Sequence, residues 1–431
     1  MKHHIANATW GVLDYATYPL GLLIAAPWVL RSIGVERYGV WMMASALSMT
    51  GGVIASGLGD ANIRITARLR GQGNAAAVIR SVENALGLHI SLGCCVAGVA
   101  WLLSSWIARR SAGTLYTEGL WSLRIASATI LLRAVETVCV STLRGLTLYG
   151  VAYRTAGVCR ILGLAAALLA AASIHRVTGM MMATLLVSAA GLLLQMRSAA
   201  AALCSTRLRP RLEWRSIAPL LRFGSFTWIQ ALAALLFAQV DRLAVGILFG
   251  ATQVTMYAIC SQLTQPLYGL TAAGLHFIFP YVASNSSHNN LRSRVVRLIG
   301  LNIALSVLGG VLLAAFGPTA LSWVAGARAT TADASLLNAM ACASALAAMS
   351  VTGFYAMLAL DRPGVVCGLA IAGSVAGAAL MPLLTQTYGP TGMAFARSVY
   401  AVVGLLVYAP LLGLLARKAR CVETVPSWEE A

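Results

Sequence analysis

The chain has 431 residues, of which 59% are hydrophobic and only 10% are charged. A soluble globular domain carries about 25% charged residues, so this composition excludes an ordinary soluble fold and indicates helices surrounded by lipid. The formal net charge is +18, and only Lys2 and Lys418 are lysines. In so apolar a chain, this charge favours an anionic lipid surface or an anionic ligand over nucleic acid.

Apolar runs of about 20 residues, separated by clusters of charge, follow one another along the chain. In chain order, the predicted spans are 10–30, 38–59, 82–106, 121–142, 155–174, 177–196, 224–249, 254–280, 298–321, 335–359, 364–384 and 391–415. Only His175 and Arg176 interrupt the stretch 155–196, but one helix of that length would reach about 60 Å, so two crossings are expected. The length of the first run suits a membrane span better than a cleavable signal peptide.

The basic residues predict the orientation of these spans. With the N-terminus inside, 20 of the 31 lysines and arginines fall in cytoplasmic segments and 6 in outside loops. Cytoplasmic loops of membrane proteins carry an excess of lysine and arginine. We therefore expect a multi-pass membrane protein with both termini in the cytoplasm.

The longest inside loop, 197–223, lies near the middle of the chain and divides it into six spans and six spans. An ungapped shift of 216 residues places Gly34 on Gly250, Trp41 on Tyr257 and Gly93 on Gly309, and a shift of 213 aligns Thr178-Gly179-Met180 with Thr391-Gly392-Met393. This order predicts a parallel repeat, a plan found in transporters that alternate access. The expected fold is an all-α integral membrane protein of about twelve helices. They form two six-helix lobes, residues 1–215 and 216–431, related by a pseudo-twofold axis along the membrane normal.

The sequence contains none of the enzyme motifs considered. A phosphate-binding loop of the type G-x-x-x-x-G-K-[ST] needs a lysine, and none lies between the two terminal ones. The nine cysteines show no C-x-x-C spacing, and the six histidines show no ligand spacing beyond the terminal pair. We therefore expect no catalytic residue, no metal site and no cofactor.

Charges inside the spans are the most informative residues, because burying them is costly unless they pair or face water. They are the candidates for a substrate cavity: Asp14, Arg133, Glu136, Arg160, Asp241, Arg242 and Arg397. Arg133 and Glu136 are three residues apart and share a helix face, so a purely structural ion pair is an open alternative. Asp241 and Arg242 are adjacent and point about 100° apart, so both cannot face one partner. Glu83 and Arg124 lie near span ends, where long side chains reach the membrane boundary.

Short motifs in the chain resemble those of a known family. The stretch Arg31-Ser32-Ile33-Gly34-Val35-Glu36-Arg37-Tyr38-Gly39-Val40-Trp41 and the sequence Gly57-Leu58-Gly59 resemble the polysaccharide flippases. These are the Wzx-like members of the multidrug/oligosaccharidyl-lipid/polysaccharide exporter superfamily. Asp241-Arg242-Leu243-Ala244-Val245-Gly246, followed by Tyr257 and Ala258, resembles their seventh and eighth spans.

The resemblance implies an inner-membrane flippase whose cargo is a polyprenyl-pyrophosphate-linked oligosaccharide. Guanidinium groups pair bidentately with phosphate, so arginines would suit its pyrophosphate, while Asp14, Glu136 or Asp241 could carry a coupling proton. A multidrug antiporter of the same superfamily is the first alternative, although arginines match or outnumber acids within the spans. A membrane-embedded glycosyltransferase or polymerase is the second, although those usually have a sizeable periplasmic loop.

Overall fold

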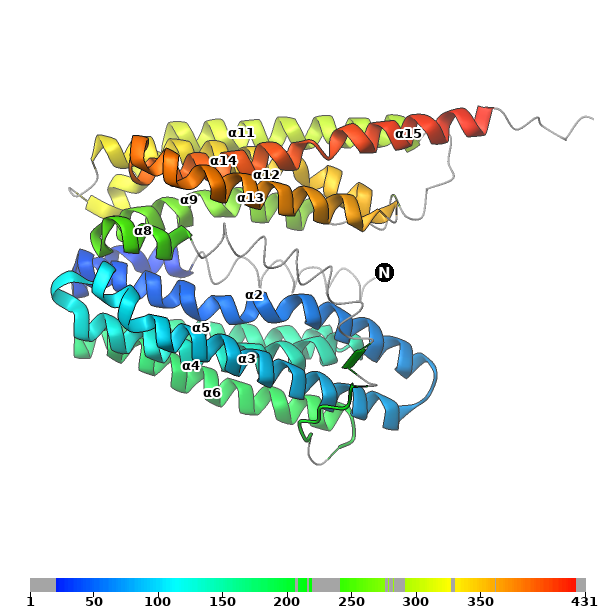
Figure 1. Cartoon of the computed structure of the whole chain (residues 1–431), viewed down its shortest axis with the longest axis horizontal. Coiled ribbons are helices and arrows are strands. Elements are labelled where there is room, and N and C mark those ends of the chain that lie inside the picture. The colour runs from blue at the N-terminus through cyan, green and yellow to red at the C-terminus, as the bar shows by residue number, and fades with distance from the viewer. Residues whose placement is uncertain are drawn as a thin grey trace, which may run out of the picture. The chain divides into compact units, whose positions relative to one another are not determined.

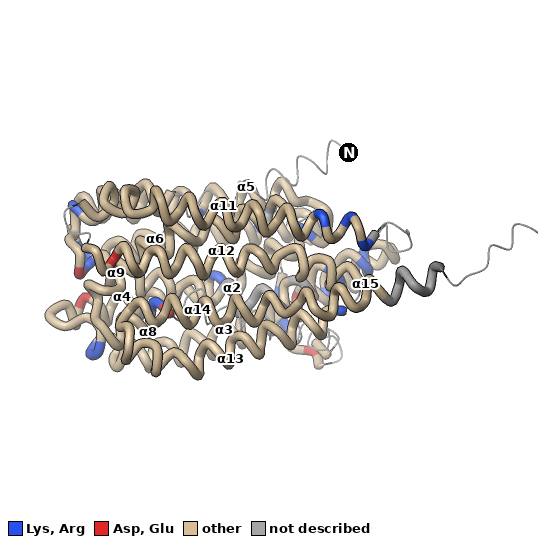
Figure 2. Tube along the Cα trace, turned by 90° about the horizontal axis from the view of Figure 1, so that it is seen from above, with Lys and Arg blue, Asp and Glu red and all other residues tan. Residues whose placement is uncertain are grey.

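The structure is a computed structural model and describes residues 21–205, 208–214, 217–218, 241–275, 278, 282, 291–326, 330–360 and 362–423. Within these ranges the chain is helical between short turns, and no strand occurs. In the part of the chain that the structure describes, seven helices are long and apolar enough to cross a membrane, and most charged residues lie toward helix ends (Figure 2). The predicted spans 10–30 and 224–249 fall largely outside the described residues.

The chain divides into two compact units, Met1–Gln262 with Trp323–Ala329, and Leu263–Ser322 with Thr330–Ala431. The first unit holds a helix over Gly21–Ile33, then α2 (Val35–Gly71), α3 (Ala75–Ser111), α4 (Tyr116–Gly145), α5 (Tyr149–Ile174), α6 (Val177–Ala202) and α8 (Asp241–Phe249). A 3-10 turn, η1 (Gly113–Leu115), precedes α4. The division between the units falls within α9 (Ala251–Leu275).

Helices α2 to α6 pack side by side (Figure 1). Small residues let them approach closely: a Cβ built on Gly51 of α2 would lie 2.5 Å from the carbonyl oxygen of Ile130 in α4. Further along the same pair, the Asn62 amide donates hydrogen bonds to Ser141 Oγ at 2.8 Å and Thr142 Oγ1 at 3.0 Å. Close backbone approach and polar bonds are the usual means of joining helices in lipid, which is as apolar as leucine.

One carboxylate joins three helix starts at one end of the first unit. Glu118, in the first turn of α4, accepts a hydrogen bond from Arg37 Nε of α2 at 3.1 Å and another from the backbone N–H of Val177 at 2.5 Å. The second bond satisfies one of the free N–H groups at the start of α6. The ends of three helices are thereby held at a common level.

At the other end of α3, the loop that follows α6 is bonded to the helix. Arg211 Nε lies 2.8 Å from Glu83 Oε2, and the backbone N–H of Arg211 donates to Glu83 O. The backbone N–H of Glu213 donates to Asn84 Oδ1 at 2.6 Å. A Cβ on Gly87 would lie 2.0 Å from Arg211 O. The expectation that Glu83 reaches the membrane boundary is therefore wrong, because this loop covers the carboxylate and leaves the residue 5% exposed.

The start of α9 packs against the start of α2. A Cβ on Gly39 would lie 1.8 Å from Ala251 O, and Thr255 Oγ1 donates to Val35 O at 2.6 Å. Each helix follows a glycine with φ of +83°, Gly34 before α2 and Gly250 before α9. That left-handed conformation is costly for residues with a Cβ, which explains glycine at both positions.

The second unit contains α12 (Thr331–Ala359), α13 (Pro363–Tyr388), α14 (Pro390–Leu405) and α15 (Tyr408–Glu423). It also contains the part of α11 (Leu291–Ala325) that ends at Ser322. Asn302 of α11 donates to Ala348 O at 3.1 Å and Met349 O at 2.9 Å in α12. The predicted last span is interrupted at residues 406–407. Pro410 explains the break, because it lacks an N–H to bond residue 406 and its ring clashes with that carbonyl.

The helix starts confirm the internal repeat read from the sequence. Helices α3 and α11 begin 216 residues apart, α4 and α12 215, α5 and α13 214, and α6 and α14 213. The shift falls by one at each connection, so both shifts seen in the sequence belong to a single repeat. The division into lobes at residues 215 and 216 stays a prediction, and these matching starts agree with it.

Candidate functional site

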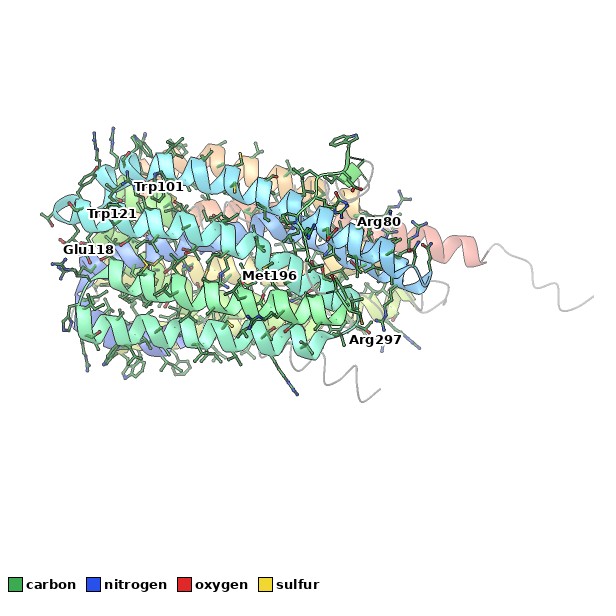
Figure 3. The ribbon with its side chains drawn as sticks, turned by 90° about the horizontal axis from the view of Figure 1, so that it is seen from below. Arg80, Trp101, Glu118, Trp121, Met196 and Arg297 are labelled. Atoms are coloured by element: carbon green, nitrogen blue, oxygen red, sulfur yellow. The ribbon has the colours of Figure 1, made fainter. Side chains whose placement is uncertain are left out.

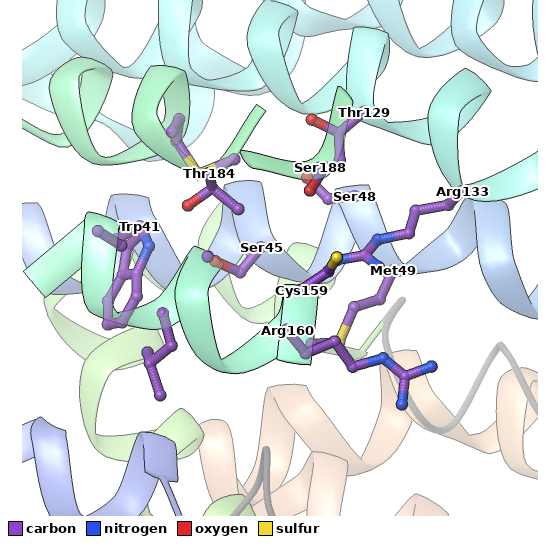
Figure 4. A pocket seen from close by; sticks show the side chains of 14 residues that line it. Trp41, Ser45, Ser48, Met49, Thr129, Arg133, Cys159, Arg160, Thr184 and Ser188 are labelled. Atoms are coloured by element: carbon purple, nitrogen blue, oxygen red, sulfur yellow. The ribbon is translucent and has the colours of Figure 1, made fainter. Parts of the chain in front are cut away.

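A polar cavity lies inside the first unit, between α2, α4, α5 and α6. Its volume is about 40 Å³, which is room for about three water molecules. Figure 4 shows Trp41 at one end and Arg133 and Arg160 at the other. The lining consists of Trp41, Ser45, Ser48, Met49, Thr129, Arg133, Cys159, Arg160, Gly163, Leu164, Ala167, Met181, Thr184 and Ser188.

Arg133 is held by a carboxylate one helical turn away. Its Nη1 lies 2.7 Å from Glu136 Oε2, and the other oxygen of Glu136 accepts a hydrogen bond from Gln195 Nε2 of α6 at 3.3 Å. The side chains of Arg133 and Glu136 are 24% and 11% exposed. The pair is therefore mostly shielded from solvent, and Gln195 fixes the carboxylate from a second helix.

Arg160 of α5 lines the same cavity, so the structure brings together three of the predicted site residues: Arg133, Glu136 and Arg160. The described lining contains two guanidinium groups and no carboxylate. Glu136 stands behind Arg133 rather than in the lining. Glu136 offsets one of the two guanidinium charges, so the three groups together carry one net positive charge, and the cavity suits an anionic group better than a cationic one.

Hydroxyl groups form much of the remaining polar wall. Ser48, Thr129 and Thr184 each donate to a carbonyl four residues earlier in their own helix, at 2.9–3.0 Å. Their hydrogens are engaged in these bonds, so their oxygens serve mainly as acceptors toward the cavity. Water or an N–H group can bind them there.

Asp241 and Arg242 lie elsewhere, in the buried first turn of α8. Tyr257 of α9 donates its hydroxyl to Asp241 Oδ2 at 2.7 Å, and Arg242 Nη2 bonds Ser261 Oγ at 3.3 Å. In these two contacts the charged side chains bond different residues of α9. Both bonds join α8 to α9 across the turn at Gly250.

The remaining two candidates are Arg397 and Asp14. Arg397 is a half-buried residue of α14 in the second unit. Its neighbour along the helix face, Tyr400, packs closely on Gly373, where a Cβ would lie 3.1 Å from the Tyr400 ring. Asp14 lies outside the described residues.

Several lining residues were absent from the sequence-based set, although a weak signal for them exists. Thr184 and Ser188 recur at helical spacing in a very apolar helix, as do Ser45 and Ser48. Uncharged polar residues also join helices in membranes, so periodicity alone does not separate a cavity wall from a helix contact. Only the packing of α2, α5 and α6 around α4 distinguishes them.

Comparison with known proteins gives a family match over most of the chain. The model of a family described as "Polysaccharide biosynthesis protein" matches residues 31–330. No curated protein matches the chain.

Solved structures share the fold. An inward-facing multidrug resistance MATE family transporter of the MOP superfamily superposes with a TM-score of 0.69 at 15% identity, covering 94% of this chain and 99% of the other. The lipid II flippase MurJ in an inward closed conformation gives 0.70 at 12% identity, with 97% and 89% covered. A MOP superfamily transporter from Pyrococcus furiosus, whose binding pocket is described as having reverse polarity, gives 0.54 at 14%, with 97% and 95% covered. The expected fold class, an all-α membrane protein of about twelve helices in two lobes, is confirmed.

Proposed function

The chain belongs to the polysaccharide biosynthesis protein family, and on that premise we propose that it is a flippase for a polyprenyl-pyrophosphate-linked oligosaccharide. It would act in a bacterial inner membrane, with both termini in the cytoplasm, and perform no covalent chemistry. Family membership supports the link to polysaccharide. The cationic cavity supports the pyrophosphate as the recognised group.

This proposal rests on one observation: Arg133 and Arg160 both line the cavity, and the described lining contains no carboxylate. Two guanidinium groups offer forked donors that match phosphate oxygens. A transporter of cationic drugs needs the opposite charge in its cavity. The wall therefore favours an anionic headgroup over a drug cation.

The size of the cavity limits what it can hold. About 40 Å³ accommodates waters or part of a phosphate group, but not an oligosaccharide. In this proposal the cavity binds the headgroup, and the sugars move along a path outside it. A coupling proton or sodium ion belongs to the proposal too, with Asp14, Glu136 and Asp241 as candidate carriers.

A deletion strain tests the assignment of cargo. We expect lipid-linked oligosaccharide to accumulate on the cytoplasmic face and surface polysaccharide to fall. Normal surface polysaccharide together with altered drug resistance would overturn the proposal in favour of a multidrug antiporter.

Substitutions then test the cavity. Arg133→Lys and Arg160→Lys keep the charge but lose the fork, so export should fall while protein abundance stays normal. Arg154→Gln is the matched control, because Arg154 is exposed on α5 and does not line the cavity. If a variant with both Arg133→Ala and Glu136→Ala folds and exports at the normal rate, the pair serves packing alone.

A further inference from the structure

Arg124 lies within cation–π distance of two tryptophan rings on the surface of the first unit. Its Cζ is 5.0 Å from the ring centre of Trp101 in α3 and 5.2 Å from that of Trp121, one turn earlier in α4. Trp101 and Trp121 are 44% and 50% exposed. Figure 3 shows these two tryptophans close together, toward the same end as Glu118 and away from Arg80.

The indole rings attract the charge of the guanidinium, but they offer no oxygen acceptor to its N–H groups. An aromatic face attracts a cation through its quadrupole, whereas arginine also carries five N–H donors at its edge. Arg124 Nε is buried and has no hydrogen-bond partner among the described residues, so the two Nη groups are the donors that a ligand could reach. The site therefore holds a positive charge whose donors need oxygen acceptors.

The depth of Arg124 in the bilayer follows from α4. Arg144 lies 20 residues further along the same uninterrupted helix, which is a rise of about 30 Å and matches the thickness of the hydrocarbon core. Arg144 is also paired with an aromatic ring, its Cζ lying 4.8 Å from the centre of Tyr153. Because the sequence predicts a span over 121–142, with one arginine near each end, we expect Arg124 at the level of lipid phosphates, where tryptophan is enriched.

From these features we propose that Arg124, Trp101 and Trp121 form a binding site for the phosphate of an anionic phospholipid. The phosphate oxygens accept from the edge of the guanidinium, and the indoles pack on the glycerol and upper acyl chains. A choline group would have to compete with the Arg124 guanidinium for the same two indole rings. A zwitterionic headgroup would also bring its own ammonium close to the guanidinium, so an anionic lipid is favoured. The site is separate from the Arg133 cavity and does not depend on the proposed cargo.

Native mass spectrometry of the full-length protein in detergent tests the site, with phosphatidylglycerol as the probe. Arg124→Gln should weaken phosphatidylglycerol binding about tenfold, the effect of losing one charge-assisted phosphate contact. Arg110→Gln, at an exposed arginine near the same end of α3, should leave binding unchanged. Arg124→Lys, which keeps the charge but loses the planar fork, should give an intermediate loss and provides a second variant if the glutamine protein misfolds.

Four results would overturn the proposal. They are equal affinity of wild type and both Arg124 variants, an equal loss in Arg110→Gln, equal binding of phosphatidylcholine, or displacement of the lipid by inorganic phosphate at similar concentration. The first two would mean that binding does not depend on this arginine. The third would remove the preference for an anionic lipid, and the fourth would show a site for free anions.

Discussion

Gly39 of α2 gives the sharpest test of how the start of α9 is packed. In Gly39→Ala, the added Cβ would lie 1.8 Å from Ala251 O and 2.6 Å from its carbonyl carbon, whereas real Cβ atoms keep at least 3.0 Å. The backbone must therefore retreat by about 1.2 Å. Overpacking of this kind costs roughly 1–3 kcal/mol, while alanine gains at most about 1 kcal/mol in helix propensity.

We expect Gly39→Ala to unfold at a temperature lower by about 2–6 °C, measured by thermal unfolding of the purified protein in detergent. Gly98→Ala is the matched control, since it changes the same residue type in a helix where a Cβ meets nothing within 4 Å. That variant should be as stable as the original protein or slightly more stable. A Gly39→Ala protein that unfolds at or above the original temperature would refute the packing.

A second substitution at the same contact makes the test more specific. Thr255→Val removes the hydroxyl that donates to Val35 O, a loss of about 1 kcal/mol. Because the alanine at residue 39 already separates the two helices, the double variant should lose less than the sum of the single losses. Fully additive losses would mean that the two residues do not share one contact.

Three further outcomes follow from the first unit. Gly87→Ala would place a Cβ 2.0 Å from Arg211 O, so the loop after α6 should detach from α3 and become several-fold more sensitive to protease, with Gly98→Ala again unchanged. Asn62→Ala removes the amide that bonds two hydroxyls of α4 and should lower the free energy of unfolding by roughly 0.6–1.7 kcal/mol, measured by denaturant titration. In a variant whose only cysteine is the exposed Cys204, a membrane-impermeant thiol reagent should label inverted vesicles and spare right-side-out ones, and the reverse pattern would refute the topology.

Much of the local arrangement could be predicted from spacing. Arg133 and Glu136 are three residues apart on one helix, so their contact follows from the helical period, and the structure confirms it. Gln195, which binds the same carboxylate, lies 59 residues further along the chain. Its role depends on how α6 is rotated against α4, and no local pattern encodes that rotation.

Glu83 is a second residue whose partner could not be predicted from the local sequence. Its place near the end of a span suggested a side chain that reaches the membrane boundary, but its partner is a loop more than 120 residues later in the chain. A carboxylate near a helix end is equally compatible with solvent and with a covering segment. Only the docking of that loop decides between them.

By itself, the sequence determined the membrane class, the succession of spans and the internal repeat. These depend on hydropathy, charge and periodicity, which are properties of each segment. The tertiary structure decided which of the buried charges meet: Arg133, Glu136 and Arg160 around one cavity, with Asp241 and Arg242 bonded separately to α9. The physical reason is that lipid and protein interior are similarly apolar, so hydropathy places a helix in the membrane without fixing its neighbours. Those are selected by close packing and a few polar bonds between residues far apart in the chain.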